Sequence, residues 1–198
     1  MPDAQQDLAV IRRLMEESQT AVAEDGRHFL LWGALTAVGL LGTWAAVVGA
    51  VALDPRWLWA AVVAVGWAGS FWMGIRGGRR SRVRTLGGRL IAVVWISCGV
   101  TLTLIAAAGL LGGVVPVQAL SGLVAVVLAG GFLGSAVLTG QRWLGAVAAA
   151  WWLGGGVMLF FPGLYTLPLL AAMAIALEVV PGLVLRRQAR RRPVAQAA

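Results

Sequence analysis

One carboxylate lies inside a long apolar stretch, and its chemistry is the easiest in the chain to define. Glu178 is the only acidic residue in the apolar segment 164–185. At the centre of a bilayer, a comparable charged residue costs roughly 2.5 to 3.5 kcal/mol, so Glu178 should face the interior of a helical bundle. There it could act as a gate, a proton site or a cation ligand.

Pro181 and Gly182 follow Glu178 closely and should disturb the helix around it. Proline has no backbone N–H and clashes with the preceding turn, which would free the carbonyl of Leu177. The alternative is a purely structural role, in which Glu178 carries a proton or forms an ion pair near the cytoplasmic edge. The candidate partners for that ion pair are Arg142 and Arg186.

A second candidate site combines two indoles with a run of glycines. Trp151 and Trp152 precede three consecutive glycines, Gly154, Gly155 and Gly156. Each glycine should weaken a helix by about 1 kcal/mol. Either the helix breaks here to line a pocket, or a neighbouring helix packs directly on the backbone. The indoles could stack on a flat apolar or cationic ligand, or they could belong to the bundle core.

Other catalytic chemistry lacks the residues that it needs. The single cysteine, Cys98, rules out an intramolecular disulfide and any multi-cysteine metal site, and the single histidine, His28, rules out a histidine cluster. Lipid phosphotransferases need several carboxylates at the membrane edge, and only Glu178 and Asp54 are available, on opposite sides. We therefore expect a protein that is not an enzyme and that holds no cofactor and no metal.

The composition identifies the elements that must position these residues as membrane spans. Of the 198 residues, 60% are hydrophobic and 12% are charged, whereas soluble domains contain roughly 25% charged residues. We predict an all-α, polytopic membrane protein, a bundle of six transmembrane helices preceded by an N-terminal cytoplasmic amphipathic helix. The predicted spans are approximately 29–52, 57–75, 90–111, 117–139, 143–161 and 164–185.

The N-terminal segment should form a separate amphipathic helix from Ala4 to about Glu24, ended by Asp25 and Gly26. Residues 1–28 contain six acids against three arginines, which favours docking on protein over adsorption to an anionic bilayer. The face expected to bind a partner consists of Leu8, Ile11, Met15 and Val22. The expected domains are a cytoplasmic helix (1–28), the transmembrane bundle (29–185) and a basic cytoplasmic tail (186–198).

The net charge of +8 is best explained by membrane topology. All sixteen basic residues are arginines, and most lie in Arg76–Arg89 and in Arg186–Arg192, while Arg56 alone falls on the opposite side. This asymmetry predicts that both termini are cytoplasmic. The two clusters should contact anionic lipid headgroups, and we expect no nucleic-acid partner.

The 27 glycines supply close helix contacts, within the bundle or between two copies of the chain. A homo-oligomer is thus one expected assembly, and a complex with another protein is the other.

Two motifs resemble those of small bacterial membrane proteins with six spans and no assigned function. They are Ile11-Arg12-Arg13-Leu14-Met15-Glu16-Glu17-Ser18 and Arg142-Trp143-Leu144-Gly145. The resemblance implies a bacterial inner-membrane protein and carries over no catalytic residue. Our leading hypothesis is a non-enzymatic subunit that binds a partner or modulates a complex. The alternative is a small-molecule or ion carrier, or its substrate-binding subunit, with Glu178 in the pathway.

Overall fold

The computed structural model describes residues 2–78 and 86–191, and every regular element in these ranges is helical. The predicted all-α fold is therefore confirmed. The first five helices are α1 (Pro2–Val47), α2 (Pro55–Gly78), α3 (Leu86–Leu110), α4 (Val117–Thr139) and α5 (Arg142–Phe160). The last long helix consists of α6 (Thr166–Ala174), a π-helical turn η1 (Ile175–Val179) and α7 (Val180–Arg191).

Six stretches within these helices are long and apolar enough to cross a membrane, which supports a multi-pass membrane protein. They are Gly26–Val47, Pro55–Arg76, Leu86–Leu110, Val117–Thr139, Arg142–Phe160 and Thr166–Gln188. Each one overlaps a span predicted from the sequence, because a long apolar segment satisfies its backbone polar groups in lipid only by forming a helix.

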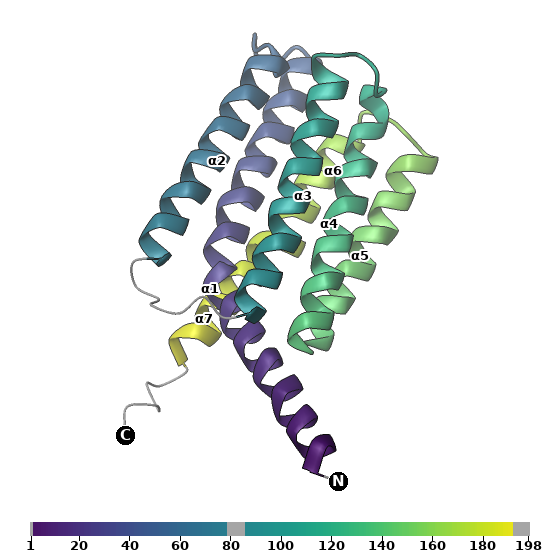
Figure 1. Ribbon diagram of the computed structural model, residues 1–198. Helices are drawn as coiled ribbons and strands as arrows, with labels where there is room; N and C mark the ends of the chain where they lie inside the picture. Colours follow the sequence, from purple (N-terminus) through teal and green to yellow (C-terminus); the bar gives the residue numbers. More distant parts are fainter. Residues whose placement is uncertain (1, 79–85, 192–198) are drawn as a thin grey trace.

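The predicted break after the N-terminal segment is wrong. α1 is one helix of 46 residues that passes through Asp25 and Gly26 without interruption. Figure 1 shows it in purple, running from a projecting N-terminal end into the middle of the bundle. Gly26 has a packing role instead, since a Cβ at this position would lie 2.8 Å from the carbonyl oxygen of Gly182. The N-terminal segment and the first span therefore form one continuous helix.

α1 is the central element of the bundle. It contacts α2, α3, α4 and all three parts of the last long helix, whereas α5 packs mainly on α4. In Figure 1, α2 flanks one side of α1 and the α4–α5 hairpin lies on the other side. Phe29 of α1, Trp95 of α3 and Phe132 of α4 pack their rings together beside α1, with centroids 4.7 to 5.3 Å apart.

Four tryptophans join neighbouring helices by the same contact. In each case the indole Nε1–H donates a hydrogen bond to a serine or threonine hydroxyl on the adjacent helix. The pairs are Trp32–Ser70 (3.0 Å), Trp59–Thr43 (3.0 Å), Trp67–Thr103 (3.3 Å) and Trp95–Ser135 (3.0 Å). These indole–hydroxyl contacts link α1 to α2, α2 to α3 and α3 to α4.

A glycine lies one helical turn before each of the four hydroxyls and provides space for the ring. The indoles of Trp32, Trp59, Trp67 and Trp95 lie over Gly66, Gly39, Gly99 and Gly131, respectively. Small residues and interhelical hydrogen bonds are the usual sources of helix association in lipid, where apolar burial gives little advantage. The glycines at these positions therefore pack the bundle itself.

Candidate functional site

Glu178 lies in the π-helical turn that interrupts the last long helix. Only 3% of the surface of this residue is exposed. In the turn, the Val180 N–H bonds to the carbonyl of Ile175, five residues earlier. Pro181 follows directly and cannot donate a hydrogen bond, so the α-helical pattern cannot continue unchanged through this point. The disturbance expected at Pro181 is thus a widened turn just before the proline, a feature frequently found at functional sites.

The widened turn packs against α1 through glycines. A Cβ added at Gly33 would lie 3.2 Å from the Cβ of Glu178 and 3.3 Å from the carbonyl oxygen of Ala174. Further along the same contact, a Cβ at Gly182 would lie 2.9 Å from the carbonyl oxygen of Gly26. The two helices therefore touch almost backbone to backbone, and Glu178 is held in this contact.

The ion pair with Arg142 or Arg186, one of the alternatives that the sequence left open for Glu178, does not form. Within the described part of the chain, Glu178 makes no salt bridge and no side-chain hydrogen bond. Arg186 is eight residues further along the helix, which places its backbone about 12 Å away along the axis. Its Cγ would lie 3.1 Å from a Cβ at Gly26. The carboxyl of Glu178 is thus buried without a protein partner.

The two adjacent indoles of the second candidate site separate in the structure. Trp151 is fully buried in the core, and its Nε1 has no hydrogen-bond partner. Trp152 points outward and is 43% exposed. They do not form one stacking surface, and Trp151 lacks the hydroxyl acceptor that the four indole–hydroxyl contacts provide.

The glycine run after the indoles does not break the helix, because α5 is continuous from Arg142 to Phe160. A Cβ at Gly155 would lie 3.1 Å from the Cβ of Ala125 on α4. Gly154 is covered by the side chain of Met173 on α6, while Gly156 has open space. Close packing, one of the two alternatives left open by the sequence, therefore accounts for two of the three glycines.

A shallow groove of about 340 Å³ separates α5 from α6 and η1 close to both candidate sites. Its lining is apolar and consists of Ala150, Ala172, Met173, Ala176 and Leu177. Ala150 precedes Trp151 and Leu177 precedes Glu178, so these two unpartnered residues lie at similar depth in the bundle. Glu178 itself turns away from the groove and towards Gly33 of α1. A second apolar groove, of about 410 Å³, lies between α1 and α2.

The N-terminal part of α1 docks on the ends of α3 and α4 over residues 14–19. A Cβ at Gly87 would lie 2.7 Å from the Ser18 backbone nitrogen. The side chain of Gln19 donates a hydrogen bond of 2.8 Å to the carbonyl oxygen of Thr139. These contacts were not predicted, because a glycine near the start of a span looks like any other turn glycine in the sequence.

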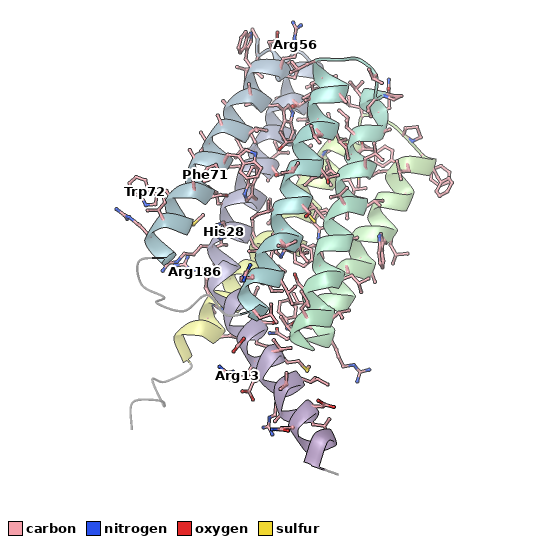
Figure 2. The ribbon with its side chains drawn as sticks, in the orientation of Figure 1. Arg13, His28, Arg56, Phe71, Trp72 and Arg186 are labelled. Atoms are coloured by element: carbon pink, nitrogen blue, oxygen red, sulfur yellow. The ribbon has the colours of Figure 1, made fainter. Side chains whose placement is uncertain are left out.

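The predicted partner-binding face is divided by this docking. The side chain of Met15 contacts Gly140 of the same chain. Leu8 and Ile11 remain 66% and 54% exposed, and the side chain of Val22 lies outside the described residues. The polar face carries two intrahelical ion pairs, Arg12–Glu16 and Arg13–Glu17. Figure 2 shows Arg13 on the projecting end of α1, and Arg56 at the opposite end of the molecule.

The other titratable groups do not gather into a site. Across residues 2–78 and 86–191, no group of three or more His, Cys, Asp or Glu side chains is arranged to hold a metal ion. Asp54 accepts hydrogen bonds from the Arg56 side chain, the shortest from Nη2 at 2.9 Å, and from its backbone nitrogen at 2.9 Å. The Arg56 guanidinium lowers the pKa of Asp54 in this exposed turn.

The fold and the site together define an all-α, multi-pass membrane protein in which the carboxyl of Glu178 is buried without a partner among the described residues. No protein family, no curated protein and no solved structure matches this chain. The resemblance to small bacterial six-span proteins therefore stays a prediction, and functional inference rests on the residues and contacts described above.

Proposed function

We propose that the chain is a non-enzymatic subunit of a bacterial inner-membrane complex and that it binds a protein partner through the cytoplasmic end of α1. The observation that carries this proposal is the continuity of α1 from the projecting end into the centre of the bundle. A partner bound to residues 2–13 would hold the same rigid helix that contacts α2, α3, α4 and the last long helix.

The chemistry of the projecting end favours a protein over a lipid surface. Leu8, Val10 and Ile11 are all more than half exposed. An exposed apolar group on a helix flanked by charges of both signs is typical of helix-in-groove recognition. Asp7, Glu16 and Glu17 surround Arg12 and Arg13, and their negative charges weaken any attraction to anionic headgroups.

The proposed orientation places both termini in the cytoplasm, with headgroup contacts at Arg76–Arg89 and Arg186–Arg192. It is tested by introducing single cysteines at Arg13 and at Asp54 in a Cys98→Ala background. An impermeant thiol reagent added to intact cells should label position 54 and leave position 13 unlabelled until the membrane is opened. The reverse pattern would overturn the orientation.

The partner is tested by site-specific crosslinking in the native membrane. A photoreactive amino acid at Ile11 should give a discrete crosslinked product, and the same group at Arg13, on the other face of the helix, should give much less. Ile11→Glu and deletion of residues 2–13 should abolish co-purification of the crosslinked protein, while the docking residues 14–19 keep the bundle intact. Equal crosslinking from both positions would refute the proposed face. A product between identical chains would identify a homo-oligomer.

A second candidate function is a carrier, or the substrate-binding subunit of one, with Glu178 in its pathway. The observation in its favour is the burial of that carboxyl without a partner beside a widened helical turn. Intramembrane ionisable residues commonly mark ion and substrate pathways. Purification in lipid nanodiscs followed by identification of bound small molecules tests it, since Glu178→Gln should abolish binding of any pathway ligand. A ligand retained equally by the variant would remove Glu178 from the pathway.

A further inference from the structure

Neutralising the Glu178 carboxylate takes one positive charge, which the described residues do not supply. We propose that Glu178 is a binding site for one monovalent cation, a proton or Na⁺, held at the contact of α1 with the last long helix. The inference concerns binding alone, so it holds whether or not the chain transports anything and whether or not α1 binds a partner.

The charge balance around Glu178 is the first argument. An ionised carboxylate buried alone costs several kcal/mol, so it is normally paired, metal-bound or neutral. The elements packed against η1 are α1, α5, α6 and α7. Their charged and titratable residues near or within the spans are Arg27, His28, Arg142, Arg186 and Arg187. None of these side chains forms an ion pair with Glu178.

These groups also lie at a different depth from the carboxyl. Gly33 marks the level of Glu178 on α1, and His28 precedes it by five residues, or about 7.5 Å of helix rise. Arg186 is about 12 Å further along its own helix. A neutralising charge must therefore come from outside the described residues, and we infer a bound cation whose valence is fixed. One carboxylate balances one positive charge, whereas a divalent ion would leave a surplus charge in the apolar interior.

The backbone of the widened turn is the second argument. The Val180 N–H is committed to the carbonyl of Ile175, and Pro181 has no N–H to give. The carbonyl of Ala176 therefore loses its donors both four and five residues ahead. This under-bonded carbonyl belongs to Ala176, which lines the groove beside α5, so it lies on a different side of the turn from the Glu178 carboxyl. The carboxyl itself therefore holds the cation, whether a proton or Na⁺, and the missing hydrogen bond makes the turn easier to open for it.

The third argument is that Glu178 is almost, but not completely, buried. Glu178 keeps 3% of its surface exposed, and its Cβ lies close to the backbone of Gly33 on α1. Because no side chain stands at Gly33, a small displacement of the two helices there would open space beside Glu178. The geometry thus fits a cation that exchanges with the surrounding water.

The test uses dicyclohexylcarbodiimide, an apolar reagent that forms a stable adduct with protonated carboxyls in apolar surroundings. The full chain in lipid nanodiscs is treated over a range of pH, and the modified residue is identified by peptide mass mapping. We expect an adduct at Glu178 whose rate of formation falls by about tenfold for each pH unit once the bound proton is lost. At constant pH and ionic strength, replacing choline chloride with sodium chloride separates the two cations.

Each outcome of this test decides the proposal. A pH-dependent adduct that Na⁺ slows assigns Na⁺ and the proton as competitors, and one unaffected by Na⁺ assigns the proton alone. An adduct that forms only after the chain is unfolded, or at a rate independent of pH, would overturn the proposal.

Four variants keep the result interpretable. Glu178→Gln should eliminate the adduct while the chain stays folded, as judged by gel filtration and circular dichroism, because a neutral amide replaces a neutral carboxylic acid. Asp54→Asn should leave the adduct unchanged, because Asp54 is exposed and bonded to Arg56. Glu178→Asp, which keeps the carboxyl, should retain a pH-dependent adduct if Glu178→Gln fails to fold. Deletion of residues 2–13 should not alter labelling, so failure of the partner-binding proposal can be recognised separately.

Discussion

The indole Nε1 of Trp95 on α3 donates a hydrogen bond of 3.0 Å to the hydroxyl of Ser135 on α4. The same ring lies 3.2 Å from where a Cβ would stand at Gly131, one turn before Ser135. The Ser135 hydroxyl in turn donates to the Gly131 carbonyl at 2.9 Å. This arrangement gives both the tight packing and the satisfied polar atoms that helix association in lipid requires.

Replacing Trp95 with phenylalanine should destabilise the bundle by about 1 kcal/mol for the lost hydrogen bond, in addition to the lost ring contacts. Thermal or denaturant unfolding in a mild detergent measures the change. A double-mutant cycle with Ser135→Ala isolates the hydrogen bond from the packing. Trp152→Phe is the control, because this partly exposed side chain should tolerate the change. Additive effects of Trp95→Phe and Ser135→Ala would show that the hydrogen bond contributes nothing.

Adjacent glycines on α5 should respond differently to replacement by alanine. A Cβ at Gly155 would lie 3.1 Å from the Ala125 Cβ and 3.3 Å from the Gly122 carbonyl oxygen, so Gly155→Ala should cost roughly 1 to 3 kcal/mol by overpacking. At Gly156 nothing lies within 4 Å, so Gly156→Ala should be neutral or stabilise the helix by up to about 1 kcal/mol. Both are measured by unfolding in the same detergent, and equal effects would contradict this packing.

The six spans could be predicted from the sequence because their signal is local. Apolar length and arginine position are properties of consecutive residues, and a single helix needs no partner to satisfy its backbone in lipid. Even so, the sequence at Asp25 and Gly26 predicts a break, because both residues favour turns locally. The contact of Gly26 with Gly182, which packs α1 closely on the last long helix at this point, joins residues 156 positions apart in the chain.

The candidate site was only partly predictable for the same reason. Glu178 is conspicuous as the sole acid in its span, and Pro181 marks a disturbed turn. The absence of any partner for Glu178 among the described residues depends on the depth of each arginine in the bundle, which no sequence pattern reveals. Similarly, Trp151 and Trp152 are neighbours in sequence, yet only Trp151 faces the core.

Docking of the N-terminal part of α1 should depend on Gly87. A Cβ there would meet the backbone at Ser18 and the carbonyl oxygen of Leu14 at 2.9 Å, so Gly87→Val should displace residues 14–19 from the bundle while the six spans still insert. Limited proteolysis in nanodiscs should then cleave within the first 25 residues faster than in the native chain. Gly74→Val is the control, because no atom lies within 4 Å of that position. Unchanged proteolysis of Gly87→Val would show that this contact does not hold α1 in place.

The turn between α1 and α2 should show the ordinary pH dependence of an exposed ion pair. Hydrogen bonds from Arg56 lower the pKa of Asp54 in the folded chain. A carboxyl with a lowered folded-state pKa stabilises the fold at pH values above its unfolded pKa, and this contribution is lost as the pH falls through the folded value. Because both side chains are substantially exposed, the contribution should be small. Asp54→Asn should therefore lower the melting temperature slightly at neutral pH and leave it unchanged in acid. A difference that grows towards acid pH would contradict this sign.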